Sequence, residues 1–244
     1  MSKAKNVRYI FPTICGISGY NTYYSFSYFA LDLILGDLYK KWNFNPFNYY
    51  EFGTGGGRSL GLFLKALKKF SKQFNLSINE FNIFLFDSFE GLPVFSDVKD
   101  KNPTWNKGQF KGTIEQLTSV IKRTLPNILP NVNFIKGYYE DSLTEELKNS
   151  LVNYPPSIVN IDVDYYSSTK TVLKWLCDLP QDGTIFYFDD IYAYLGNLSK
   201  GEYRAIDEFN KEHLKDGHQF YPFVMNFNIP TFIGKIYTLN KVEK

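Results

Sequence analysis

From residue 48 onward, short runs of aromatic and β-branched residues alternate with segments whose apolar residues recur every three or four positions. This order is typical of a parallel sheet, because each parallel strand needs a long crossover, usually a helix, before the next one. We therefore predict an α/β fold with a mostly parallel seven-stranded sheet, helices on both faces and an antiparallel C-terminal strand pair.

The pattern also places the individual elements. The five parallel strands are expected at 48–52, 82–86, 132–136, 157–163 and 184–188. The closing antiparallel pair is expected at 218–227 and 231–239, with a turn at 228–230. Apolar residues with a helical period predict helices over 59–74, 113–124, 144–151, 168–179 and 201–215.

Residues 1–47 have a different character from the rest of the chain. A turn signal between Gly16 and Gly19 is followed by a Tyr-rich stretch and a predicted helix over 25–40. We expect an N-terminal cap or lid segment at 1–47 and a single catalytic-type α/β domain at 48–244. An extra helix packed on the side of the sheet is the alternative, and the sequence leaves both open.

Composition narrows the classes of partner. The 244 residues carry a formal net charge of +2 and no polybasic stretch, which argues against a nucleic-acid partner. No window approaches eighteen apolar residues and no secretory leader is evident, so we expect no membrane span. Cys15 and Cys177 lie in apolar surroundings, as buried, reduced thiols do, which favours a cytoplasmic protein.

Carboxylates gather where two of the predicted strands end. Asp189 and Asp190 follow the run 184–188, and Asp162 and Asp164 end the run before it. Each close pair of such charges repels by about 4 kcal/mol at an effective dielectric near 20, so the group needs a cation or a proton. Oxygen ligands without His or Cys favour Mg²⁺, or another divalent cation of that type, over Zn²⁺.

The two histidines of the sequence lie apart from this acidic group. His213 and His218 lie in the last helix and the turn after it, and we interpret them as surface or core residues. The sequence places no histidine visibly close to either thiol. A Cys/His nucleophile is therefore not expected.

A glycine-rich turn, Glu51-Phe52-Gly53-Thr54-Gly55-Gly56-Gly57, joins the first strand to the first helix. Such a turn lets a ligand approach the backbone closely, although a purely structural turn is the alternative. The dinucleotide fingerprint fails because Arg58 replaces its third glycine. Asp87 at the end of the second strand is positioned for ribose hydroxyls and Glu51 for an ammonium group, which together suit S-adenosylmethionine.

Five segments come in an order that is similar to a known family. They are Phe86–Pro93, Lys136–Leu143, Asp162–Thr169, Gly183 with Asp189-Asp190, and Arg204–Phe209. Together they resemble the macrocin O-methyltransferase family of sugar O-methyltransferases over roughly residues 48–212. The chain departs from the family pattern at Val163 and Asp182, where glycines are usual, and at Tyr165, where leucine is usual.

The resemblance implies a Rossmann-like class I methyltransferase fold and a set of site residues. It implies that Asp162, Asp189 and Asp190 bind a divalent cation, with Asp164 as an alternative ligand. We further expect Asp162 to be the catalytic base, and an acceptor that is a small molecule, a sugar or glycoside. A homodimer is also compatible with the resemblance. The expected cofactor-binding residues are Glu51, Gly53, Thr54, Gly55, Ser59, Asp87, Ser88, Tyr139 and Glu140.

Two other functions fit the same residues. A methyltransferase for a phenolic or catechol hydroxyl uses a similar acidic arrangement, and an aromatic-lined mouth would favour it. A non-catalytic subunit that binds S-adenosylmethionine would keep the cofactor residues without needing a metal. A nucleic-acid methyltransferase is disfavoured, because neither a basic face nor a base-flipping motif is evident.

Overall fold

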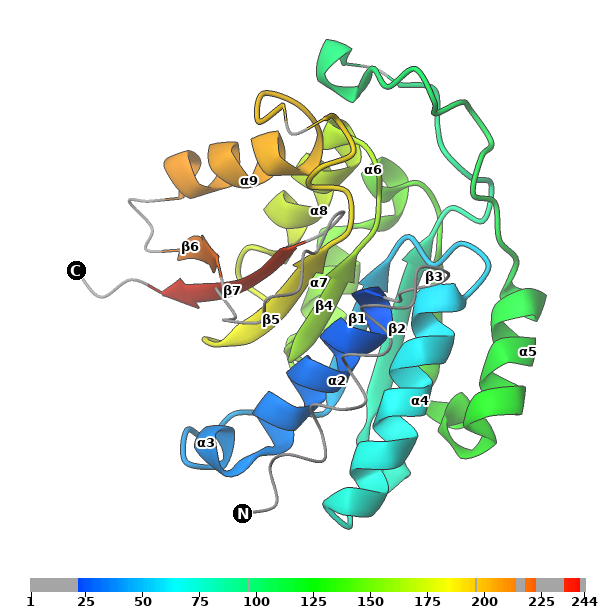
Figure 1. Cartoon of the computed structure of the whole chain (residues 1–244), viewed down its shortest axis with the longest axis vertical. Coiled ribbons are helices and arrows are strands. Elements are labelled where there is room, and N and C mark those ends of the chain that lie inside the picture. Colours follow the sequence, from blue (N-terminus) through cyan, green and yellow to red (C-terminus); the bar gives the residue numbers. More distant parts are fainter. Residues whose placement is uncertain (1–21, 96, 196, 214–217, 223–234, 242–244) are drawn as a thin grey trace.

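The structure is a computed structural model of the chain, and it describes residues 22–95, 97–195, 197–213, 218–222 and 235–241. One sheet of seven strands runs in the order β3-β2-β1-β4-β5-β7-β6 (Figure 1). Strands β1 to β5 are mutually parallel, β7 pairs antiparallel with β5, and β6 pairs antiparallel with β7. The predicted fold class is confirmed. The strands are β1 Asn48–Phe52, β2 Asn82–Asp87, β3 Val132–Lys136, β4 Ile158–Ile161, β5 Thr184–Phe188, β6 His218–Pro222 and β7 Lys235–Lys241.

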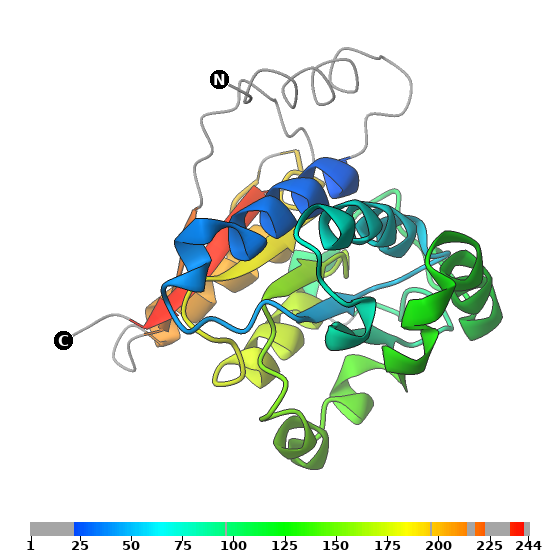
Figure 2. The same cartoon turned by 90° about the horizontal axis from the view of Figure 1, so that it is seen from below.

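Helices cover both faces of the sheet, as Figures 1 and 2 show. Helices α2, α4 and α5 lie on one face, and α7, α8 and α9 lie on the other. The helices are α2 Thr22–Leu35, α3 Asp37–Lys40, α4 Arg58–Gln73, α5 Ile114–Thr124, α6 Tyr139–Ser142, α7 Glu145–Ser150, α8 Tyr166–Leu176 and α9 Gly201–Glu212. Short 3₁₀ turns are η1 Ile78–Glu80, η2 Val98–Asp100 and η3 Pro126–Asn131.

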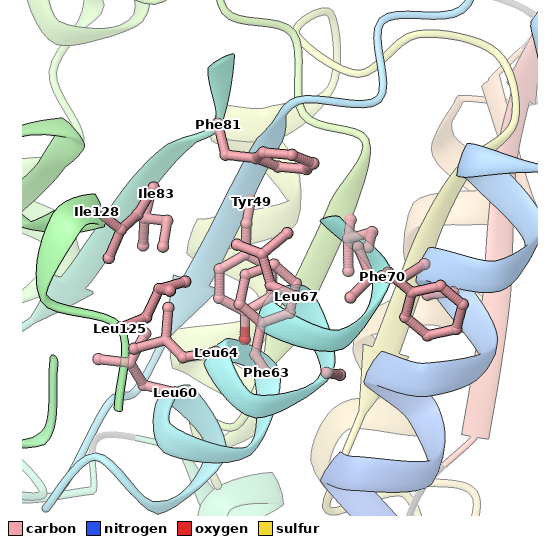
Figure 3. Packing of buried hydrophobic residues seen from close by; sticks show 14 of the residues in the cluster. Tyr49, Leu60, Phe63, Leu64, Leu67, Phe70, Phe81, Ile83, Leu125 and Ile128 are labelled. Carbon is pink, nitrogen blue, oxygen red and sulfur yellow. The ribbon is translucent and has the colours of Figure 1, made fainter. Parts of the chain in front are cut away.

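The alternation of side chains along each strand creates two hydrophobic cores. In β1, Tyr49 faces the core under α4 and stacks on Phe63, with ring centroids 3.7 Å apart (Figure 3). Its neighbour Tyr50 faces the opposite core, where Phe52 stacks on Phe86 at 4.3 Å. Burying a large apolar side chain contributes about 1.5–3 kcal/mol, so both faces hold the strands in register.

The predicted N-terminal helix is divided into two. Helix α2 ends at Leu35, and α3 starts after Gly36, where a Cβ would lie 2.7 Å from the carbonyl oxygen of Asp32. Helix α2 packs beside α4, and Phe26 stacks on Tyr187 of β5 at 4.8 Å. Residues 1–21 lie outside the described residues, so the division into a segment at 1–47 and a domain at 48–244 stays a prediction.

The C-terminal strands are confirmed with shifted boundaries. β6 begins at the predicted residue and is described to Pro222, and β7 is described from Lys235 to Lys241. The predicted turn at 228–230 falls outside the described residues. Among the described residues, no helix combines the length and apolar character that a membrane span requires.

Candidate functional site

An open cavity of about 450 Å³ lies at the carboxyl ends of the central strands. In an α/β sheet this edge, where neighbouring crossovers run in opposite directions, is the usual place for a ligand. The cavity is lined by eleven of the twelve predicted site residues, all except Glu51: Gly53, Thr54, Gly55, Ser59, Asp87, Ser88, Tyr139, Glu140, Asp162, Asp189 and Asp190.

The glycine-rich turn needs its first glycine for two reasons. Gly53 has φ +79°, a left-handed conformation that residues with a Cβ rarely adopt. A Cβ there would also collide with the backbone carbonyl oxygen of Asp162. The turn therefore passes directly over the end of β4, which brings the backbone of residues 53–57 to the side of the acidic group.

Asp87 holds the turn in place from the end of β2. Its Oδ2 accepts hydrogen bonds from the backbone N–H groups of Thr54 at 2.7 Å and Gly55 at 3.1 Å, and from Thr54 Oγ1 at 3.2 Å. Its Oδ1 accepts from the N–H of Phe89 at 2.7 Å. The carboxylate is thus fixed at the cavity wall, and its contact with a ribose stays a prediction.

Glu51 lies behind the cavity wall and is fully buried. Its carboxyl group accepts hydrogen bonds from Ser59 Oγ and from the Tyr49 hydroxyl, the latter at 2.7 Å. Burial raises the pKa of Glu51 to about 7, against the opposing effect of those two donors. Ser59 lines the cavity, and Glu51 lies behind Ser59 and accepts its hydrogen bond. The predicted contact of Glu51 with an ammonium group stays a prediction.

Three carboxylates converge at the ends of β4 and β5. The backbone N–H of Asp162 bonds to Phe52 O at 3.0 Å and that of Asp189 to Ile161 O at 3.1 Å, which aligns the strand ends. Asp162, Asp189 and Asp190 offer oxygens that all lie within 4.8 Å of one another. Asp164 is outside this group, and the choice between Asp162 and Asp164 as the ligand stays a prediction.

The surroundings of this acidic trio contain still more carboxyl groups. Burial and then the charge of Asp162 raise the pKa of Asp164, and burial and then the charge of Asp164 raise that of Asp190. Glu202 of α9 is also buried, and its Oε2 accepts from the backbone N–H of Asp190 at 2.8 Å. Asp190 Oδ2 and Glu202 Oε1 are buried without a hydrogen-bond partner among the described residues. This side of the cavity is therefore short of positive charge.

One part of the cavity wall was predicted only at its start, Ser88, namely the loop that joins β2 to α5. Its ends are held together by backbone bonds of 2.9 Å from Leu92 N to Gln109 O and from Gly108 N to Leu92 O. Trp105 of this loop lines the cavity and packs edge-on against Tyr194, with ring centroids 5.5 Å apart. The available signal was the length of the connection, because long loops in compact domains are commonly functional.

A buried aspartate anchors the same loop. Asp100 is fully buried, and its Oδ1 accepts from the N–H of Ser167 in the first turn of α8 at 2.9 Å. Its carbonyl oxygen accepts from the Tyr194 hydroxyl at 3.1 Å. The loop thus rests on elements that also position the acidic trio. No sequence pattern marked Asp100 or Glu202, because both act through contacts between distant segments.

The expectation that no histidine lies near a thiol is wrong for Cys177. Its Sγ lies 3.5 Å from Nδ1 of His213 and 3.9 Å from Nδ1 of His218. The three residues come from separate elements, so their spacing in the sequence gave no sign of the contact. Cys15 lies outside the described residues. None of Cys177, His213 and His218 lines the cavity.

A sequence profile described as Macrocin-O-methyltransferase (TylF) matches residues 56–216, more than half of the chain. Together with the fold and the cavity, this match identifies an S-adenosylmethionine-dependent O-methyltransferase. The chain belongs to the macrocin O-methyltransferase family. The resemblance seen in the five sequence segments is thereby confirmed.

Solved structures support the same fold. CalS11, a calicheamicin methyltransferase, is 21% identical, with a TM-score of 0.56 over 86% of this chain and 77% of that one. The O-methyltransferase NovP is 14% identical, with a TM-score of 0.61 over 90% and 79%. An O-methyltransferase from Bacillus cereus, solved with S-adenosylhomocysteine, is 15% identical, with a TM-score of 0.54 over 99% and 93%. A search of curated protein sequences gave no match.

Proposed function

We propose that this enzyme transfers the methyl group of S-adenosylmethionine to a hydroxyl of a sugar or glycosylated small molecule, with Mg²⁺ or a similar cation held by Asp162, Asp189 and Asp190. The observation that carries this proposal is the acidic trio, whose oxygens converge within 4.8 Å beside the glycine-rich turn. One similar structure, of CalS11, is described as a TDP-rhamnose 3'-O-methyltransferase, which supports a sugar acceptor.

The residues fit a hard divalent cation. Mg²⁺ prefers oxygen ligands and is commonly held by a few carboxylates, with water or substrate completing its shell. Asp190 Oδ2 is buried with no hydrogen-bond partner among the described residues, and a cation would satisfy it. When bound, such a cation lowers the pKa of a hydroxyl at this site and so favours loss of its proton.

The residues of the chain account for the rest of the reaction. The acceptor oxygen attacks the methyl carbon in line with the carbon–sulfur bond, whose electron pair stays on sulfur in the thioether product. The hydroxyl proton passes to the carboxylate of Asp162. Residues 53–59 and Asp87 orient the donor, and holding the reacting atoms in line contributes up to roughly 7–11 kcal/mol in well-oriented systems. No covalent enzyme intermediate is required.

A phenolic or catechol acceptor is the second candidate. The observation that favours it is the aromatic lining of the cavity, which includes Trp105, Phe110, Tyr138 and Tyr139. Aromatic rings stack on a planar phenol, but they also cover the apolar face of a sugar. The acceptor class is therefore decided by assay.

The test is a methyl-transfer assay with isotopically labelled S-adenosylmethionine. A panel of nucleotide sugars, glycosides and catechols is incubated with the enzyme in the presence of Mg²⁺ or EDTA, and labelled products are identified by mass spectrometry. We expect a labelled sugar ether that EDTA abolishes and added Mg²⁺ restores. Transfer to catechols alone would favour the second candidate. If the protein binds S-adenosylmethionine but neither transfers the methyl group nor binds Mg²⁺, a non-catalytic subunit would be favoured.

A further inference from the structure

A second cluster of metal-ligating side chains lies away from the cavity. Cys177 follows the last residue of α8 and Asp178 comes next, His213 follows the last residue of α9, and His218 begins β6. Three elements that are separate in the sequence therefore meet at one sulfur atom. None of these four residues lines the cavity, so the cluster is independent of the proposed function.

The spacing of the ligand atoms matches a tetrahedral metal site. Zn–S bonds of about 2.3 Å and Zn–N bonds of about 2.0–2.1 Å at a tetrahedral angle place sulfur and nitrogen about 3.5 Å apart. Cys177 Sγ lies 3.5 Å from His213 Nδ1 and 3.9 Å from His218 Nδ1. Cys177, Asp178 and His218 offer ligand atoms that all lie within 4.8 Å of one another. His213 is outside this group, so its ring must rotate to share the same ion.

The cluster is largely shielded from solvent. Cys177 and His218 expose only 8% and 9% of their surface. The Nδ1 atom of His218 faces the sulfur of Cys177, while its Nε2 atom, on the other side of the ring, is buried without a hydrogen-bond partner among the described residues. Asp178 approaches from the solvent side, with 71% of its side chain exposed and an oxygen 3.6 Å from Lys148 Nζ.

We propose that Cys177, Asp178 and His218, with His213 as fourth ligand, bind one Zn²⁺ ion that joins α8, α9 and β6. A thiolate, two imidazoles and a carboxylate are ligands that suit tetrahedral zinc, whereas the all-oxygen trio at the cavity suits magnesium. The thiol loses its proton on binding, and the proton is released to solvent. The ion holds the end of α9, the helix whose first turn places Glu202 against the backbone of Asp190.

Cobalt is the probe that distinguishes the two metal sites, because only a sulfur ligand gives a thiolate-to-cobalt charge-transfer band. Metal-free full-length protein is titrated with Co²⁺ and followed in the near ultraviolet and visible. We expect the band to saturate at one equivalent, with the strong visible absorption of tetrahedral cobalt, and to disappear when Zn²⁺ displaces the cobalt. Absence of the band in the wild-type protein would overturn the proposal.

Matched variants assign the band. C177S is expected to abolish it, while C15S, which removes the only other thiol, and D189N, which damages the acidic trio, are expected to keep it. H213Q changes a half-buried ligand and is expected to weaken Co²⁺ binding at least about tenfold, since even outer-shell partners of metal ligands contribute that much. A band that persists in C177S, or an unchanged affinity in H213Q, would refute the assignment.

Thermal unfolding provides a readout that does not depend on spectra. Zn²⁺ that binds only the folded chain raises its melting temperature. We expect this increase for the wild-type protein and for C15S, and its loss in both C177S and H213Q. If C177S does not fold, the result for H213Q still tests the proposal. An equal increase in all four proteins would show that zinc binds elsewhere.

Discussion

The carboxylates on the two sides of the cavity differ in their hydrogen bonding. On the side of β1 and β2, Asp87 accepts four hydrogen bonds and Glu51 accepts from two hydroxyl donors. On the side of β4 and β5, Asp190 and Glu202 each keep a buried oxygen without a partner among the described residues. The carboxylates of the first side are held by protein donors, whereas the proposed function completes the second side with a bound cation.

The largest effect is expected from damage to the second side. D189N removes a charge from the acidic trio, and we expect kcat to fall by about 100-fold or more, the scale of a lost metal-binding or acid–base function. The dissociation constant of S-adenosylmethionine should stay nearly unchanged by calorimetry, because the turn at 53–57 is intact. D182N, at the exposed residue before β5, is the matched control and should retain activity. Equal losses of turnover and cofactor binding in D189N would show that the residue is structural.

A stability effect of intermediate size is expected on the first side. Burial raises the pKa of Glu51 to about 7, so the folded state binds a proton that the unfolded state releases above its ordinary value of 4.5. The protonated carboxyl is favoured in the folded chain, and its contribution is complete below pH 4.5 and is lost as the pH rises toward 7. The contribution of Glu51 to the free energy of unfolding therefore falls by about 3 kcal/mol between pH 4.5 and pH 7.

The variant E51Q isolates this contribution, because glutamine keeps the shape and cannot ionise. We expect the free energy of unfolding of E51Q, relative to the wild-type protein, to increase between pH 4.5 and 7 in denaturant titrations without cofactor. Asp164 and Asp190 also shift upward, but they are present in both proteins and cancel in the difference. A difference that is constant with pH would contradict the raised pKa.

A smaller effect is expected at Asp87. Replacement by alanine leaves the N–H groups of Thr54 and Gly55 without their acceptor, so the turn loses its fixed position. We expect the affinity for S-adenosylmethionine to fall by about 2 kcal/mol, roughly 30-fold, the value of a charge-assisted hydrogen bond. Calorimetry measures it, and an unchanged affinity would remove Asp87 from the cofactor site.

The smallest effect is expected at the loop that spans both sides. W105A removes an edge-on aromatic contact worth about 0.5–1.5 kcal/mol, so we expect the KM for the acceptor to rise about threefold to tenfold with kcat nearly unchanged. Trp42 exposes 77% of its surface and does not line the cavity, so W42A is the matched control. A fall in kcat with a constant KM would assign Trp105 to the chemical step instead.

The sequence predicted the strands and the meeting of their acidic ends, but not the contacts made by distant segments. Runs of aromatic and β-branched residues located the starts of β1, β2, β3 and β5. The parallel order of the strands implied that Asp162 and Asp189 would lie close together. The partners that set the charge state of these acids, such as Glu202 in α9, were not predicted, because no local pattern reports contacts between distant segments. The same reason explains why the approach of His213 and His218 to Cys177 was missed.

The backbone bonds between Leu92 and the pair Gly108 and Gln109 have an evolutionary consequence. Because main-chain atoms close the base of this loop and Asp100 anchors it, exposed side chains such as Val94, Phe95 and Val98 are free to change without releasing it. The exposed part of the loop can therefore vary in sequence while the acidic trio at the ends of β4 and β5 remains untouched.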